Sequence, residues 1–230
     1  MHVRVGAAMT DLHLSCPPLD PVDAIDAVDQ ETVPPELLPP ACATADGPVV
    51  PGPGVSVELT LHAHHRERFY ELYLEAFGPM RTLAPARQVL HHDEFLDEMA
   101  DPRVLKYVAW DHEGEPVALA TLTSDLSTVP WISPEYFAAR YPEQAARRAV
   151  YYLGFALAHP TRRSTPAFRQ VFVTILHKLA REKAVCAYDM CGFNNQTVGL
   201  AQHIETVGGQ LVDGFVEVLD TQTYYGATFR

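Results

Sequence analysis

The sequence predicts an α/β domain that follows a proline-rich acidic tail, and three observations lead to this prediction. From Val55 onward, segments with strand periodicity alternate with segments of helical periodicity. Two of the expected strands are joined by the short loop 111–115, which contains a glycine and is typical of an antiparallel hairpin. Before Val55 the chain has ten prolines and no Phe, Tyr or Trp, a composition typical of segments that bury little apolar surface.

The tail is expected to cover residues 1–54 and to be disordered or loosely packed. It carries eight acidic residues against one basic residue, Arg4, so it contributes seven of the twelve net negative charges of the chain. Apolar residues scattered over 22–38 leave open a short helix or docking motif, although an inert solubilising tail explains the same composition. The remaining residues, 55–230, are expected to form one domain.

The first half of the domain is expected to contain three strands and two helices. Residues 55–61 alternate between apolar and polar side chains, as a half-buried strand does. Apolar residues recur at helical spacing over 64–77 and again over 93–99. The two arms of the hairpin, 103–110 and 116–123, complete this half.

The second half begins with an irregular stretch at 126–148, which turns helical from Pro134 to Arg148. The apolar run 149–158 is continuous enough for a strand buried on both faces. Residues 166–183 carry one apolar stripe and form the best helix of the chain. The remaining expected elements are strands at 184–190, 211–217 and 223–229 and a short helix at 197–207.

Charge and composition exclude several classes of protein. A formal net charge of −12 argues against general nucleic-acid binding, which needs a basic surface. The sequence has no apolar run of the length that spans a membrane, and its first residues lack the apolar core of a secretory signal. Cys186 and Cys191 lie five residues apart on an expected strand, point to opposite faces and do not pair. We therefore expect a reduced, cytoplasmic protein.

A basic turn follows the buried strand. The apolar run stops at His159-Pro160, and Arg162 and Arg163 come next. Thr165 suits a helix N-cap and Pro166 suits the first helical position, so a helix N-terminus with free N–H groups follows the arginines. Such a turn is a candidate pyrophosphate site, although a cap that binds nothing has the same sequence signature.

The order and spacing of these elements resemble those of the GCN5-related N-acetyltransferase (GNAT) superfamily, over roughly residues 55–230. Leu157-Ala-His-Pro160 resembles the end of that family's fourth strand, and the next turn occupies the place of its acyl-CoA pyrophosphate loop. Asn194 and Asn195 fall where the family commonly has an Asn, and Gly208-Gly209 where it has a helix-ending glycine. The resemblance implies a mixed, mostly antiparallel central sheet with helices on both faces.

The chain departs from the family in its pyrophosphate loop. Aligned from Arg162, it has Thr165 in place of the loop's first glycine, and aligned from Arg163 it has Pro166 there. Either alignment removes a residue that lets the backbone approach phosphate closely.

The resemblance implies an acyltransferase that moves an acyl group from acyl-CoA to an amine by direct attack. Acetyl-CoA or a longer acyl-CoA would be the co-substrate, and the acceptor would be a small-molecule or peptide amine. Donor contacts are expected from the backbone of Ala156, Leu157 and Ala158, from the turn Arg162, Arg163, Ser164, Thr165, Pro166, Ala167 and Phe168, and from Asn194 and Asn195. We expect no metal, because the clustered histidines at 62–65 and 91–92 lack the spacing of a metal site.

Two residues are candidates for acid–base chemistry. The tyrosine with which the family often protonates the departing thiolate is missing, and His203 lies near its place. Imidazole titrates near neutrality, but an exposed polar position on an amphipathic helix explains His203 equally well. Tyr151 and Tyr152 alternate on the buried strand, so one faces the cleft, and we take Tyr152 as the second candidate against a plain core role. Tyr224 and Tyr225 are expected to shape the acceptor pocket.

The stretch 126–148 suggests two further possibilities. Its layout is similar to that of acyl-homoserine-lactone and long-chain N-acyl amino acid synthases, which implies a long-chain acyl-CoA or acyl-carrier-protein donor. Trp131, Tyr136 and Phe137 would then wall an acyl pocket, although such aromatics often only pack. The competing class is a non-catalytic binding or regulatory module of the same fold, favoured by the lost glycine and the missing tyrosine.

Overall fold

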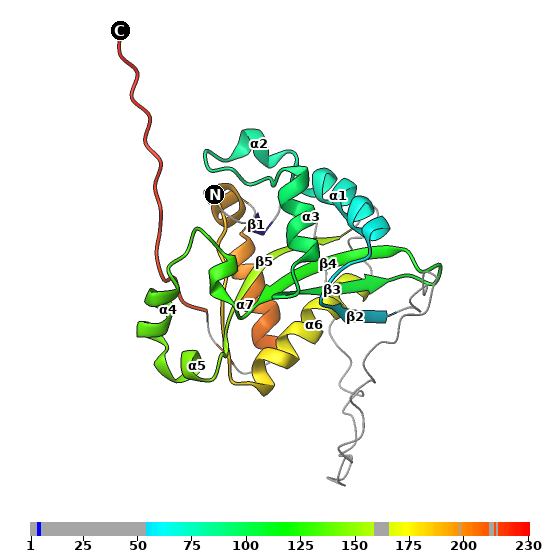
Figure 1. Cartoon of the computed structure of the whole chain (residues 1–230). Coiled ribbons are helices and arrows are strands. Elements are labelled where there is room, and N and C mark those ends of the chain that lie inside the picture. Colours follow the sequence, from blue (N-terminus) through cyan, green and yellow to red (C-terminus); the bar gives the residue numbers. More distant parts are fainter. Residues whose placement is uncertain (1–3, 6–53, 159–165, 198, 212–213, 215) are drawn as a thin grey trace. The chain divides into compact units, whose positions relative to one another are not determined.

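The computed structural model describes residues 4–5, 54–158, 166–197, 199–211, 214 and 216–230 (Figure 1). All of them belong to one compact unit of the chain. No helix in these ranges is long and apolar enough to cross a membrane.

The centre of this unit is a six-stranded sheet. Its strands are β1 (Arg4–Val5), β2 (Gly54–Glu58), β3 (Val104–Trp110), β4 (Pro116–Thr123), β5 (Val150–Ala158) and β6 (Val185–Ala187). The order is β1-β5-β4-β3-β2, and β6 also pairs with β5. The pairs among β2, β3, β4 and β5 are antiparallel, whereas β1 and β6 run parallel to β5. The predicted fold class, a mixed and mostly antiparallel sheet with helices on both faces, is therefore confirmed.

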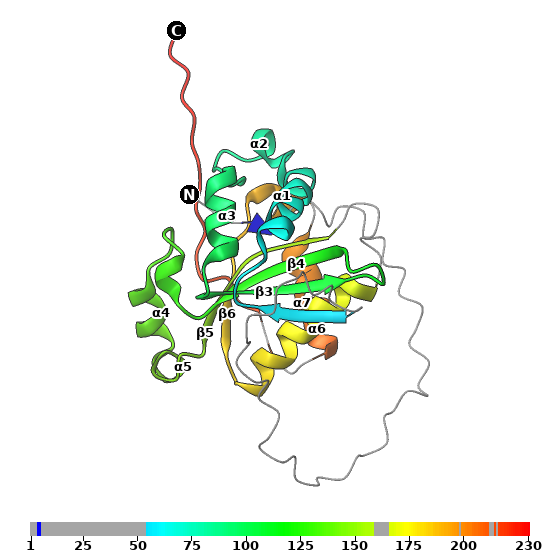
Figure 2. The same cartoon turned by 45° about the vertical axis from the view of Figure 1, so that its right-hand side comes forward.

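Helices cover both faces of the sheet. The helices are α1 (Ala63–Phe77), α2 (Met80–Leu83), α3 (His92–Ala100), α4 (Pro134–Arg140), α5 (Pro142–Ala146), α6 (Pro166–Arg181) and α7 (Leu200–Leu211), with short helical turns η2 (Leu126–Thr128) and η4 (Phe193–Thr197). Figure 2 shows α1 and α3 on one side of the sheet and α6 on the other. Apolar stripes on α1 and α6 explain this layering, because each helix must bury its stripe against the sheet.

Each face of the sheet has its own core. Under α1 and α3 the core is largely aromatic: Tyr73, Phe77 and Phe95 pack around Phe155 of β5, and Phe69 belongs to the same cluster. Under α6 the core consists mainly of small and branched residues of β3, β4 and β5 against Val171 and Ile175, and it includes the buried Tyr107 and Tyr151. β5 contributes side chains to both cores, which confirms that it is buried on both faces.

Two sequence predictions are wrong in detail. The single helix expected over 134–148 is two helices, because Pro142 has no N–H to donate and restricts the backbone of the residue before it. The two terminal strands are absent from the described residues: α7 continues to Leu211, and 216–230 contain no strand. Their alternating side chains predict strands, but an alternating segment becomes one only beside a partner.

The predicted tail begins with residues that join the sheet. Arg4 pairs with Phe155 and Val5 with Ala156, so these two residues extend the sheet rather than a loose tail. The other residues of 1–53 lie outside the described ranges, and the boundary near Val55 stays a prediction.

Lys106 provides a test of the packing between β3 and α3. Its side chain is fully buried, and its Nζ donates to the carbonyl oxygens of Leu59 at 2.9 Å and Asp101 at 2.5 Å. Burial lowers the pKa of Lys106 to about 8. Between that value and the ordinary 10.5, the unfolded chain binds a proton that the folded chain lacks, so the free energy of unfolding rises with pH through this window.

We predict that Lys106→Met abolishes this rise. The variant is also less stable at pH 7, by about 1–3 kcal/mol, because the carbonyl oxygens of Leu59 and Asp101 lose their donor at a partly buried site. Denaturant unfolding of both proteins between pH 7.5 and about pH 9.5, below the range where tyrosines titrate, checks the prediction. Parallel pH curves would show that Lys106 keeps its ordinary pKa in the folded protein.

Candidate functional site

The edge of β5 changes partner halfway along the strand. β6 pairs with β5 only at 150–152, through Val185–Ala187, whereas β5 continues to Ala158. Beyond that point β6 no longer follows β5, and Arg4 and Val5 of β1 pair with Phe155 and Ala156 instead. The carboxyl half of β5 therefore offers a backbone edge that accepts a short extended chain.

A bulge in β5 lies at the same point. On β4, Ala120 pairs with Ala156 and Leu122 with Leu153, so Thr121 faces two residues, Gly154 and Phe155. The N–H of Phe155 donates to Thr121 Oγ1 at 3.2 Å. Position 154 requires a glycine, because a Cβ there would lie 2.4 Å from that oxygen. Bulges of this kind are frequent beside active sites.

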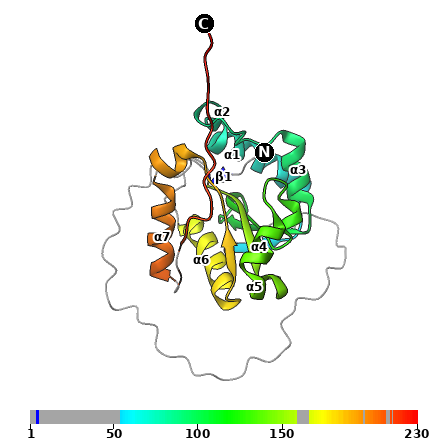
Figure 3. The ribbon, with the colours of Figure 1, turned by 90° about the vertical axis from the view of Figure 1, so that its left-hand side faces the viewer.

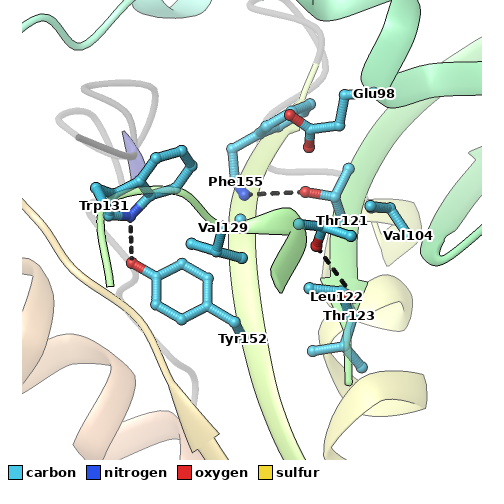
Figure 4. A pocket seen from close by; sticks show the side chains of 11 residues that line it. Glu98, Val104, Thr121, Leu122, Thr123, Val129, Trp131, Tyr152 and Phe155 are labelled. Atoms are coloured by element: carbon cyan, nitrogen blue, oxygen red, sulfur yellow. Dashed lines mark hydrogen bonds between the residues drawn. The ribbon is translucent and has the colours of Figure 1, made fainter. Parts of the chain in front are cut away.

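A partly open hollow adjoins the bulge. Its lining side chains come from α3, β3, β4, β5 and the segment after β4, among them Glu98, Thr121, Trp131 and Tyr152 (Figure 4). Glu98, on α3, is half-buried, and its Oε1 would lie 3.5 Å from a Cβ at position 154. The missing side chain of Gly154 therefore leaves the Glu98 carboxylate next to the bulged backbone of β5.

Tyr152 links the hollow to β6. Its hydroxyl donates to the carboxylate of Asp189, two residues after β6, and accepts a hydrogen bond of 3.1 Å from Trp131 Nε1. Burial raises the pKa of Tyr152, and the Asp189 carboxylate raises it further. Tyr152 is therefore protonated across the neutral range and holds two segments together, which makes it a poor proton acceptor.

The predicted donor-binding residues fall into three groups. Ala156, Leu157 and Ala158 lie on the carboxyl half of β5, as expected. Asn194 is buried in η4 and Asn195 is exposed there. Arg162, Arg163, Ser164 and Thr165 lie outside the described residues, and Pro166, Ala167 and Phe168 form the first turn of α6.

The predicted acid–base and pocket residues are more scattered. His203 lies in α7, but its side chain is not among those that the structure describes. Trp131 lines the hollow, whereas Tyr136 and Phe137 do not. Tyr224 and Tyr225 do not line it either and are exposed at the end of the chain, so their role at the acceptor pocket stays a prediction.

Sequence reasoning missed Glu98 and Gly154. A glycine inside an apolar strand is a recognised sign of a bulge, so Gly154 carried a usable signal. Glu98 gave none, because its position beside β5 depends on how α3 packs across the sheet. Within the described ranges, no group of three or more His, Cys, Asp or Glu side chains is arranged to hold a metal ion.

No family model matches the chain, and no curated protein matches it. Among solved structures, the chain is similar to an acetyltransferase from Trypanosoma brucei, with 15% identity, a TM-score of 0.41, and 75% of this chain and 99% of the other covered. It is also similar to the aminoglycoside N-acetyltransferase AAC(6′)-Iy in complex with CoA, with 14% identity, a TM-score of 0.42, and coverage of 76% and 98%.

The bulge gives a direct prediction. Gly154→Ala places a methyl group against Thr121 Oγ1, so the variant should lose about 1–3 kcal/mol of stability through overpacking. The double variant Gly154→Ala with Thr121→Ala removes the clashing oxygen and should regain part of that loss. Chemical denaturation of the wild type, both single variants and the double variant measures the coupling. Additive effects would mean that the two positions do not touch.

Proposed function

We propose that this domain is an N-acyltransferase that moves an acyl group from acyl-CoA to an amine. One observation carries the proposal: a bulge lies where β5 parts from β6, with a backbone edge beyond it that only the two residues of β1 occupy and a carboxylate-bearing hollow beside it. An extended donor and an amine acceptor can approach the same point of β5 from these two places.

The donor binds along the carboxyl half of β5. The pantetheine arm of CoA is an extended chain with two amides, and such a chain can hydrogen-bond to a strand edge as β1 does at Phe155 and Ala156. The pyrophosphate then lies toward the N-terminus of α6, which Arg162 and Arg163 precede in the sequence. This assignment gives the backbone of Ala156, Leu157 and Ala158 its expected role.

The acceptor amine occupies the hollow beside Glu98. The carboxylate attracts the ammonium form and accepts its proton, and the neutral amine attacks the thioester carbon. A C–N bond forms, a backbone N–H of β5 stabilises the oxyanion, and the C–S bond breaks to release CoA thiolate. The attacking nitrogen loses its second proton as the intermediate collapses, and the departing thiolate receives a proton in its place, relayed by water or by His203. Tyr152 acts as a positioning residue, because its hydroxyl is engaged with Asp189.

A longer acyl donor, carried by CoA or by acyl-carrier protein, is the second candidate. The observation that favours it is that Trp131 lines the hollow, where an aromatic wall suits an acyl chain. A non-catalytic module of the same fold is the third, favoured by the occupation of the β5 edge by β1.

We predict that acyl-CoA binds the full chain and that removing residues 1–12 tightens this binding. The deletion removes the strand that covers the proposed donor edge, so the donor no longer competes with it. Calorimetric titration of both chains with acetyl-CoA and octanoyl-CoA measures the two dissociation constants. If neither chain binds any acyl-CoA or an acylated carrier protein, the enzyme proposal fails. If both bind a donor equally, the donor lies elsewhere.

We predict that Glu98→Gln lowers kcat by about 100-fold or more, because the amide cannot take a proton from the acceptor. Thiol release from acyl-CoA in the presence of an amine panel measures the rate over pH 6 to 9. Asp97→Asn is the matched control, since Asp97 is an exposed carboxylate on the same helix. A Glu98→Gln protein with wild-type rate and pH profile would remove Glu98 from the mechanism.

A further inference from the structure

Basic residues gather in one part of this acidic chain. The segment 140–183 holds nine of the 17 lysine and arginine residues, but only two of the 29 acidic residues, Glu143 and Glu182. Four exposed cations lie where α5 and α6 end, and Figure 3 shows the end of α6 beside α5. The surface that we call the basic end consists of Arg147, Arg148, Arg181 and Lys183. It is positively charged although the net charge of the chain is −12.

Hydrogen bonds hold the two turns of the basic end together. Arg147 donates through Nη1 to the carbonyl oxygen of Glu182 at 3.0 Å and through Nη2 to that of Lys183 at 3.2 Å. The N–H of Val185 donates to the carbonyl oxygen of Ala149 at 2.9 Å, where the parallel strands β5 and β6 begin to pair. The turns that lead into β5 and β6 are therefore neighbours in a fixed arrangement.

The charges of the basic end have no carboxylate partner in the part of the chain that the structure describes. The Glu182 carboxylate is already engaged, because it lies 2.6 Å from Lys178 Nζ and accepts a hydrogen bond of 2.6 Å from the Tyr151 hydroxyl. None of the four cations forms an ion pair with another described residue. Four positive charges therefore face the solvent side by side.

Two of these cations stand where the backbone favours glycine. Arg148 follows α5 with a φ of 55°, and Lys183 follows α6 with a φ of 46°; among the described residues, no other side chain is carried at positive φ. Helices commonly end in a glycine at this place, because a Cβ at positive φ costs stability. A cation also complements the dipole of a helix, but α5 has only five residues, so the dipole explains little at Arg148. Both turns therefore keep a long cationic side chain on a strained backbone, as residues retained for binding do.

We propose that the basic end binds an acidic segment of another protein. Three of its four cations are arginines, whose planar guanidinium groups can each donate two parallel hydrogen bonds to one carboxylate. The two turns lie about one strand spacing apart, roughly 4.8 Å, so a short acidic segment can reach both. Nucleic acid fits less well. The rest of 55–230 carries 12 basic and 21 acidic residues, and a long polyanion would meet this acidic surface beyond the basic end.

The basic end lies away from the proposed donor edge. It adjoins the amino ends of β5 and β6, whereas the donor edge is on the carboxyl half of β5. The nine residues of β5 span roughly 30 Å. A protein bound at the basic end therefore leaves the carboxyl half of β5 uncovered, and its binding does not depend on acyl transfer.

The probe for this surface is a fluorescein-labelled peptide of ten glutamates, whose binding to the full chain is followed by fluorescence anisotropy. We expect binding that weakens as salt rises from about 50 to about 300 mM. Arg148→Gly with Lys183→Gly should weaken it at least tenfold with an unchanged melting temperature, because glycine tolerates positive φ. Arg181→Ala, which changes a residue of ordinary helical backbone, should weaken it at least threefold.

Arg68→Ala with Arg81→Ala is the matched control, since it removes two positive charges from α1 and α2 and leaves the basic end intact. The control should bind the peptide as the wild type does. Equal weakening in the control would overturn the proposal, because the peptide would then respond only to net charge. A full chain that binds no peptide would also overturn it, whether the surface is inert or covered by acidic residues of the same chain. Tighter binding of a labelled oligonucleotide of equal charge, lost in Arg148→Gly with Lys183→Gly, would assign the surface to nucleic acid instead.

Discussion

The change of partner along one edge of β5 is the constraint from which the site follows. β4 follows β5 along its other edge, but not with constant register: Thr121 faces both Gly154 and Phe155. On the opposite edge, β6 pairs with β5 over three residues only, and β1 pairs with Phe155 and Ala156 further along. A regular strand between two full-length neighbours would have no unpaired backbone to offer a ligand. The bulge and the divergence of β6 together leave part of the backbone of this buried strand without a sheet partner, and the proposed donor site uses this part.

The hollow beside Glu98 and the segment that precedes α6 carry charges of opposite sign. Glu98 and Asp189 lie on or next to the hollow, which suits a cationic amine and repels a phosphorylated donor. Arg162 and Arg163 follow β5 in the sequence and precede the N-terminus of α6, where the helix dipole favours an anion. An acidic chain can therefore still bind a polyanionic donor, provided that donor and acceptor enter from different directions.

The sequence pattern predicted those helices and strands whose start, end and apolar face are specified by neighbouring residues. The hairpin strand 116–123 was predicted at its observed bounds, and the helix from Pro166 was predicted with its start correct, because turn, cap and apolar stripe are all written in adjacent residues. The partner of Tyr152 could not be predicted in this way, since Asp189 and Trp131 reach it from segments far apart in the chain. Glu98 depends in the same way on how α3 packs. The wrong terminal strands have a different cause, because the alternation of 223–229 is real but no strand of its own domain is placed beside it.

β6 determines the position of the candidate site along β5. It is short, its first edge sets where β5 becomes accessible, and Asp189 just beyond it anchors Tyr152 at the floor of the hollow. A three-residue strand with one neighbour is held by few hydrogen bonds and should open more easily than β3 or β4. Such opening would move the point at which β5 and β6 part, so the stability of this short strand bears directly on the width of the proposed donor edge.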